Sequence, residues 1–174
     1  MTTWKLDNAH SAIEFKVKHM MISTVKGFFQ DFNISMSGDP EDISTASIRI
    51  SIASSSINTK SEQRDEHLRS EDFFNSASFP EITFDSTGIT KVKDDEYEVT
   101  GNLTVKDITK PATFHVEYGG QATDPWGNQK VGFAFNGAIN REAFGLTWNA
   151  TIETGGVMVG ADVKIQGDLQ FILS

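Results

Sequence analysis

The feature of this sequence that most constrains its fold is an alternation of apolar and polar residues that recurs along most of the chain. In residues 46–53 the even-numbered side chains are Ala or Ile, and Ser or Arg separates them. Successive side chains of a β-strand point to opposite faces, so a period of two predicts a strand with one buried face. The pattern predicts eight strands, at residues 11–19, 28–37, 46–53, 81–89, 97–105, 111–118, 129–140 and 163–173.

The alternation also bears on how these strands pair. A strand with one apolar and one polar face is typical of antiparallel sheets with one face in water. Eight such strands fit either a sandwich or an up-and-down barrel. Closure into a barrel removes the exposed edges that a long open sheet would leave. The 174 residues suit one domain, and no internal repeat or linker divides residues 1–174. We therefore expect a single all-β, antiparallel, eight-stranded barrel.

One polar segment, residues 56–74, interrupts the strands and predicts a short helix between strands three and four. Thr59 and Glu62 have the spacing of a capping box, so we expect a helix of about three turns over 60–70. One stripe of this helix contains Lys60, Arg64, His67, Leu68 and Glu71. Two interpretations follow. The helix closes the mouth of a cavity and offers polar groups to a ligand, or it is a solvated crossover with internal ion pairs such as Arg64 with Glu71.

Composition excludes several classes of function. The chain has no cysteine, so disulfides, thiolate catalysis and cysteine-bound metals are excluded. It carries 15 basic and 24 acidic residues, a net charge of −9, with no basic block. This balance argues against nucleic-acid binding and against electrostatic docking on anionic lipid.

Two further expectations concern membranes and compartment. No apolar run approaches the roughly 18 residues that span a bilayer, so we expect no integral membrane segment. The first residues lack the basic flank and apolar stretch of a secretory signal, so we expect a cytoplasmic protein.

No motif with catalytic or metal-binding spacing stands out. His10 and Ser11 are adjacent near Asp7 and would project to opposite sides of an extended chain, and no nucleophile elbow lies nearby. The four histidines lack the spacing of a zinc site. We therefore predict no catalytic residue, metal or cofactor. Arg141 follows a strand and is a candidate for a bidentate contact to a ligand head. Partnership with a carboxylate such as Asp65 or Glu142 is the interpretation we prefer.

Three glycines fall on the inward parity of their strands: Gly101, Gly137 and Gly167. Each removes a side chain from the interior. They either leave volume for a ligand or allow a bend or bulge in the strand, and the sequence does not choose between these.

An ordered set of short motifs resembles the YceI-like, polyisoprenoid-binding, lipocalin-like barrel family over nearly the whole chain. The matching pieces are Trp4-x-Leu6-Asp7-x-x-His10-Ser11, Phe15-x-Val17-Lys18-His19, Gly27-x-Phe29, Ser56-Ile57-Asn58-Thr59, Arg64-Asp65-x-His67-Leu68, Asp72-Phe73-Phe74, Phe79-Pro80-x-Ile82-x-Phe84, Gly101-x-Leu103-Thr104-x-Lys106, Thr109-Lys110-Pro111, Asn140-Arg141-x-x-Phe144-Gly145-Leu146 and Val159-Gly160-x-x-Val163. The resemblance implies a lipocalin-like barrel whose apolar pore holds a long isoprenoid or similar lipid, with the helix at its opening. Many members are periplasmic.

We accordingly expect a protein that sequesters a long apolar molecule, such as an isoprenoid, an isoprenoid quinone or a fatty amide, in lipid carriage or stress response. The predicted lining residues are Phe15, Val17, Phe32, Ile34, Ile48, Ile50, Phe84, Leu103, Phe133 and Phe135. The predicted contacts to the ligand head are Asn58, Arg64, His67 and Arg141.

Two alternatives to lipid sequestration stay open. A lipid isomerase or cyclase would need a titratable or polar group inside the pore, for which His19 and Gln30 are the candidates. A ligand-free interaction protein would have a packed core instead. Whether the chain forms a homodimer is also left open.

Overall fold

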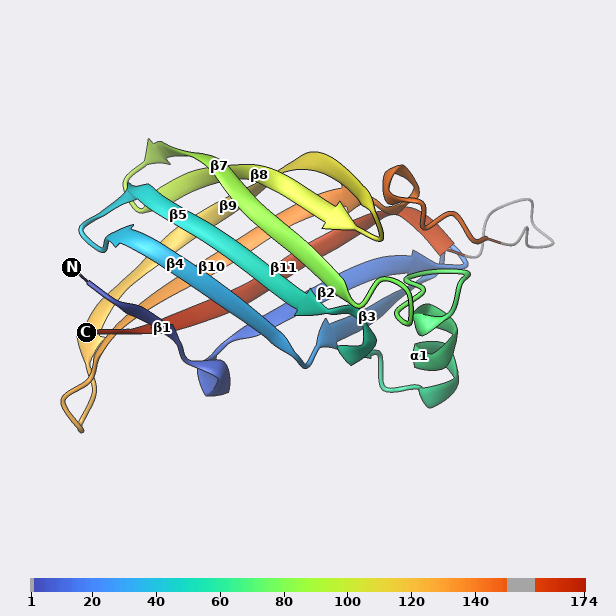
Figure 1. Cartoon of the computed structure of the whole chain (residues 1–174), viewed down its shortest axis with the longest axis horizontal. Coiled ribbons are helices and arrows are strands. Elements are labelled where there is room, and N and C mark those ends of the chain that lie inside the picture. Colours follow the sequence, from blue (N-terminus) through green and yellow to red (C-terminus); the bar gives the residue numbers. More distant parts are fainter. Residues whose placement is uncertain (1, 150–158) are drawn as a thin grey trace.

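The computed structural model describes residues 2–149 and 159–174, and strands dominate it (Figure 1). The strands are β1 (Trp4–Leu6), β2 (Ala12–His19), β3 (Ser23–Phe29), β4 (Phe32–Asp39), β5 (Asp42–Ala53), β6 (Ile57–Asn58), β7 (Glu81–Lys93), β8 (Glu96–Val105), β9 (Ile108–Thr123), β10 (Gln129–Asn140) and β11 (Val159–Leu173). The helix is α1 (Glu62–Arg69), and short 3-10 turns are η1 (Asn8–His10), η2 (Ser54–Ser56) and η3 (Arg141–Phe144).

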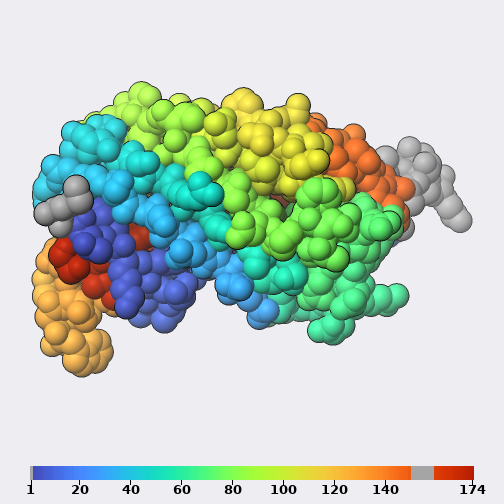
Figure 2. Space-filling model, viewed as in Figure 1, coloured from blue at the N-terminus to red at the C-terminus, as the bar shows by residue number. Residues whose placement is uncertain are grey.

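All paired strands are antiparallel and form one sheet in the order β4-β5-β7-β8-β9-β10-β11-β2-β3-β6, with β1 added beside β11. The sheet curls into a half-barrel with α1 at one end and both chain termini at the other (Figure 1). We call these the helix end and the termini end. Figure 2 shows the same division on the surface, with the blue and red chain ends packed together opposite the green α1 region. The all-β antiparallel class is confirmed.

The expected number of strands was too low, since the described residues contain eleven rather than eight. The single strand expected at 28–37 contains parts of two strands, and the first of them, β3, already begins at Ser23, where no strand was expected. Gln30 and Asp31 separate β3 from β4 and bond to other segments, with Gln30 N donating to Ser56 O. This break resets the alternation, so Phe29 rather than Phe28 is buried. β1 and β6 are too short to show a period.

The helix begins later than its sequence suggested. Ser61 is the N-cap, and its hydroxyl accepts a hydrogen bond from Arg64 N at 3.4 Å. The capping box expected from Thr59 and Glu62 is therefore wrong. Lys60 adopts a left-handed φ of 65°, which turns the chain just before the helix. Thr59 is instead buried beneath it, only 4% exposed.

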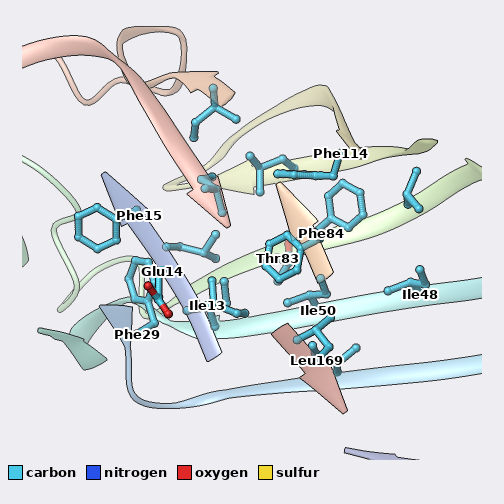
Figure 3. Close-up of a pocket in the computed structure, with 18 of the residues that line it drawn as sticks. Ile13, Glu14, Phe15, Phe29, Ile48, Ile50, Thr83, Phe84, Phe114 and Leu169 are labelled. Carbon is cyan, nitrogen blue, oxygen red and sulfur yellow. The ribbon is translucent and has the colours of Figure 1, made fainter. Parts of the chain in front are cut away.

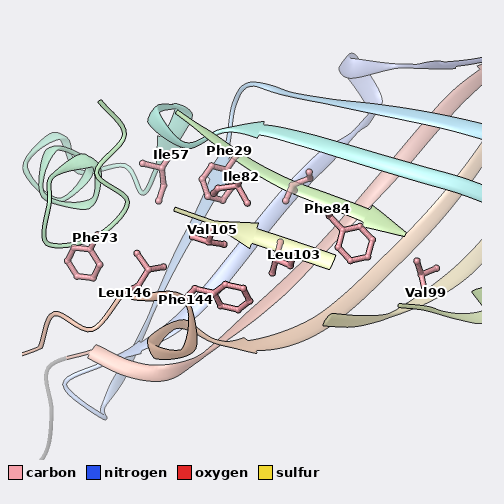
Figure 4. Packing of buried hydrophobic residues seen from close by; sticks show 11 residues of the cluster. Phe29, Ile57, Phe73, Ile82, Phe84, Val99, Leu103, Val105, Phe144 and Leu146 are labelled. Atoms are coloured by element: carbon pink, nitrogen blue, oxygen red, sulfur yellow. The ribbon is translucent and has the colours of Figure 1, made fainter. Parts of the chain in front are cut away.

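Buried apolar side chains form two groups along the half-barrel. The first extends from the middle of the sheet to the helix end and includes Phe29, Ile57 and Phe73 (Figure 4). The second lies at the termini end around Trp4, and its most buried members, Val131 and Phe171, are each 1% exposed. Side chains from both groups face an interior space.

Candidate binding cavity

An apolar cavity lies inside the half-barrel. Its volume is about 170 Å³, about ten times what one water needs. Along β11 its wall extends from Val163 to Phe171, about 26 Å at roughly 3.3 Å per residue. Figure 3 shows lining side chains from opposite parts of the sheet, such as Phe15, Ile50 and Phe114, directed toward this space. The cavity is therefore long and narrow.

Most of the predicted lining residues lie on the cavity wall. The eight that do are Phe15, Ile34, Ile48, Ile50, Phe84, Leu103, Phe133 and Phe135. Val17 and Phe32 are half-buried outside the wall. Val17 pairs with Val25 and Val163, and Phe32 packs against both core groups. That these residues contact a ligand stays a prediction.

Several lining residues were not selected from the sequence. Phe114 and Val116 belong to the inward parity of β9, so the alternation contained the signal for them. Phe29 was hidden by the break between β3 and β4. Phe74 and Leu146 lie in segments without regular alternation, and the sequence carries no signal for them.

Four phenyl rings of the wall lie over glycines of neighbouring strands. A Cβ atom at Gly167 would lie 2.8 Å from Phe135 Cε1, and one at Gly101 would lie 2.6 Å from Phe84 Cζ. Phe114 covers Gly137 and Phe15 covers Gly27 in the same way. Rings thus fill the space above the inward glycines, which do not themselves leave volume for a ligand. They let the rings lie close against the wall.

The polar residues around α1 bond to one another. Asp65 is 5% exposed and accepts hydrogen bonds from Thr59 N at 2.9 Å and Thr59 Oγ1 at 2.6 Å. Arg64 donates through Nε to Thr59 Oγ1 and through Nη2 to Thr59 O, both at 2.8 Å. Arg64 therefore bonds Thr59 rather than Glu71, the partner suggested for it if the helix were a solvated crossover. The ion pair within the helix is instead Arg69 with Glu66.

None of the three head-group candidates in the helical segment lines the cavity. Asn58 Oδ1 accepts from Lys60 N at 2.9 Å. His67 Nε2 lies 2.9 Å from Asp72 Oδ2, and its ring packs edge-on against Phe73 and Trp148. Their contact with a ligand head stays a prediction.

Arg141, the fourth candidate, lines the cavity and is 3% exposed. Its Nε donates to Gly160 O at 2.7 Å and its Nη2 to Val159 O at 3.1 Å. Its Nη1 donates to the carbonyls of Leu146 and Trp148. The interpretation that Arg141 pairs with a carboxylate is wrong, because its partners among the described residues are backbone carbonyls. Sequence reasoning could not find them, since they come from an irregular segment and the start of β11.

The guanidinium of Arg141 places a positive charge at the helix end of the cavity. Burial lowers the pKa of the guanidinium, and the nearby exposed Glu142 acts in the opposite direction. A guanidinium has five N–H donors, and the four carbonyls occupy four of them. One donor is left for an acceptor other than these carbonyls.

Aromatic rings close the termini end. Phe133 and Phe171 form the cavity wall there, with ring centroids 6.1 Å apart. Trp4 packs behind them at 6.3 Å and 5.7 Å, and its Nε1 donates to Gly38 O, which ties β1 to β4. Lys130 bonds Asp7 at 2.9 Å on the same side. This end is a packed plug.

The described residues place few titratable or metal-ligating side chains on the cavity wall. They contain no group of three metal-ligating side chains. His19 and Gln30, the candidates for an enzyme, do not line the cavity, and the charged residues on its wall are Arg141 and the exposed Glu14. Within the same described residues, no helix is long and apolar enough to cross a membrane.

Comparison with known proteins gives matches over the whole chain. The sequence model of the YceI-like domain matches residues 4–171. UPF0312 protein SA2479 of Staphylococcus aureus (strain N315) is 45% identical over 175 residues, covering 100% of this chain and 99% of the relative.

Two solved structures share the fold. Burkholderia cenocepacia BcnA has a TM-score of 0.83 at 23% identity, covering 95% of this chain and 99% of its own. A polyisoprenoid binding domain from Saccharophagus degradans, implicated in plant cell wall breakdown, has a TM-score of 0.68 at 14% identity, covering 99% of both chains. At these identities the likeness concerns the fold alone.

Proposed function

Because this chain belongs to the YceI-like domain family, we propose that its half-barrel binds and sequesters one long apolar molecule, such as an isoprenoid, an isoprenoid quinone or a fatty amide. The name of the Saccharophagus domain fits a cargo of this class. The proposal does not depend on that name, because the two chains are too distant to transfer a ligand.

The observation that carries the proposal is the shape and chemistry of the cavity. It is long, narrow and lined almost wholly by Ile, Val, Leu and Phe side chains. An apolar chain gains about 2.5 kcal/mol for each 100 Å² of its surface that leaves water. A narrow tube removes nearly all of that surface from water, so it favours a single extended chain over a compact ligand.

The two ends suggest the direction of binding. Trp4, Phe133 and Phe171 block the termini end, so the apolar tail would point there. The polar head would lie at the helix end, near Arg141. The remaining N–H donor of its guanidinium would be satisfied by a carbonyl, amide or phosphate oxygen of the ligand.

A matched pair of substitutions on β5 tests this function. Ile48 lines the cavity, whereas the neighbouring Ser47 is exposed on the other face of the strand. Ile48→Trp should fill the tube and weaken binding of a fluorescent polyprenol at least tenfold in a titration. Ser47→Trp should leave the affinity unchanged. Equal affinities of the two variants and the unaltered protein would show that the ligand binds elsewhere.

A further inference from the structure

Four lysines gather on the outer surface of three adjacent strands at the helix end. Lys16 on β2 lies directly opposite Lys26 on β3 and Lys164 on β11, and Lys18 follows on the same face of β2. Like charges placed directly opposite across a sheet repel each other. The folded chain therefore holds these positive charges close together at an electrostatic cost, although its net charge is −9.

No residue of the described ranges 2–149 and 159–174 forms an ion pair with the lysine cluster. Glu14 and Asp162 lie at its border, each two residues from a lysine on its own strand. Lys18, Lys26 and Lys164 are exposed. The patch therefore keeps a net positive charge that is open to a partner.

An apolar tip adjoins the cluster. The turn between β2 and β3 contains Met20, Met21 and Ile22, whose exposed fractions are 37%, 65% and 83%. Met20 and Met21 adopt left-handed φ angles of 53° and 62°, so the tight turn holds these side chains outside the sheet. In Figure 1 this turn lies at the helix end of the half-barrel.

We propose that the β2–β3 hairpin is a docking site for an anionic lipid bilayer. Met20, Met21 and Ile22 would enter the boundary between headgroups and acyl chains, and the four lysines would lie against the anionic headgroups. The net charge of the chain argued against such a surface, because a sum over all residues does not show that the fold brings lysines from separate strands together.

The apolar tip favours a bilayer over the other anionic partners that lysines can bind. Nucleic acid and acidic peptides would neutralise the lysines but would leave Met21 and Ile22 in water. An anionic bilayer would contact both parts of the surface, because its headgroups attract the lysines and its acyl chains accept Met21 and Ile22. Docking would also bring the helix end of the cavity to the membrane, where an apolar cargo dissolves. That last consequence rests on the proposed function, but the docking itself does not.

Vesicle flotation with the full chain tests the docking. We expect the protein to float with phosphatidylglycerol-containing vesicles at low salt and to dissociate as salt is added, since the attraction is screened. It should bind pure phosphatidylcholine vesicles much more weakly. Absence of binding to the anionic vesicles at low salt would overturn the proposal.

Charge-matched triple variants sharpen the test. Lys16→Gln, Lys26→Gln and Lys164→Gln together should weaken binding about a hundredfold, from about fivefold for each lysine. The same change at Lys5, Lys91 and Lys110, which lie outside the cluster, should change it less than twofold. The cluster variant should fold well, because it relieves repulsion. If both triple variants lose vesicle binding to the same extent, the net charge of the protein alone determines binding, and the proposed site is wrong.

Two more variants separate the remaining outcomes. Met21→Ser with Ile22→Ser should weaken binding to the vesicles at unchanged charge. If this variant binds the vesicles as the unaltered protein does, the apolar tip does not enter the bilayer and the proposed docking is wrong. If the protein binds polyglutamate but no vesicles, the partner is an acidic chain rather than a bilayer. Ile48→Trp, which blocks the cavity, should still dock, so loss of cargo binding and loss of docking are distinguishable.

Discussion

At the termini end of the half-barrel, buried aromatic rings close the cavity, whereas at the helix end the apolar wall is accompanied by hydrogen-bonded polar groups around α1 and Arg141. Trp4 and Phe171 hold the first end by packing. Thr59, Asp65 and Arg141 hold the second through hydrogen bonds to each other or to backbone carbonyls. A packed plug opens only if core surface is lost, but a short polar segment can open locally. We therefore expect the termini end to contribute more to stability, and we expect a ligand that enters the cavity to pass through the helix end.

Removal of the aromatic plug should have the largest effect on stability. Trp4→Ala deletes a side chain that is 7% exposed and should lower the free energy of unfolding by about 3–5 kcal/mol. Leu68→Ala, at a half-buried position of α1, is the matched change at the helix end and should cost clearly less. Urea unfolding of both variants checks this. Equal losses would mean that the two ends contribute alike.

Arg141 tests whether polar closure at the helix end also stabilises the fold. Arg141→Met keeps an unbranched side chain but removes four hydrogen bonds; Val159 O keeps its bond from Asn149 Nδ2, whereas the carbonyls of Leu146, Trp148 and Gly160 lose the guanidinium donor. At roughly 1 kcal/mol for each of the four lost hydrogen bonds, the free energy of unfolding should fall by about 4 kcal/mol. Arg141→Lys should restore part of it. A change below about 1 kcal/mol in urea unfolding would show that water replaces the guanidinium and that the charge is not structural.

The glycines beneath the phenyl rings offer a test in the middle of the tube. Gly101→Ala would place Cβ against the backbone of Asp85 and the ring of Phe84, so we expect a loss of about 2 kcal/mol. Gly88→Ala, in the neighbouring strand, meets no atom within 4 Å and should be nearly neutral. Thermal unfolding of the two variants gives the comparison. If Gly101→Ala leaves stability unchanged but reduces cargo binding, the glycine leaves space for the ligand after all.

Lowering the pH should destabilise the termini end, and we expect this change in the free energy of unfolding to be smaller than those caused by the substitutions above. The hydrogen bond from Lys130 lowers the pKa of Asp7 below its ordinary value of 3.8. The stabilisation is thus fully present above pH 3.8 and is lost as the pH falls through the lower pKa of the folded state. Asp7→Asn should flatten the stability profile below pH 4, whereas Asp107→Asn should not. Identical profiles for all three proteins would exclude the Asp7–Lys130 pair as the cause.

The sequence predicted those parts of the fold that depend on local alternation. The inward faces of β5, β8 and β10 followed from a period of two, and they supply much of the cavity wall. The prediction of the helix start failed because the backbone turns at Lys60, whose φ is left-handed. The N-cap is therefore Ser61 and not Thr59. Prediction from the sequence also failed where partners are distant, as for Arg141 and for the lysines of β2, β3 and β11. Such contacts depend on the completed sheet.

The most direct test of the central claim is a crystal structure of the protein with a long-chain alcohol brominated at its tail. We predict anomalous bromine density inside the half-barrel near Phe133 and Phe171, with the hydroxyl group at the helix end near Arg141. Bromine bound only on the outer surface, or an interior that excludes the alcohol, would contradict the account.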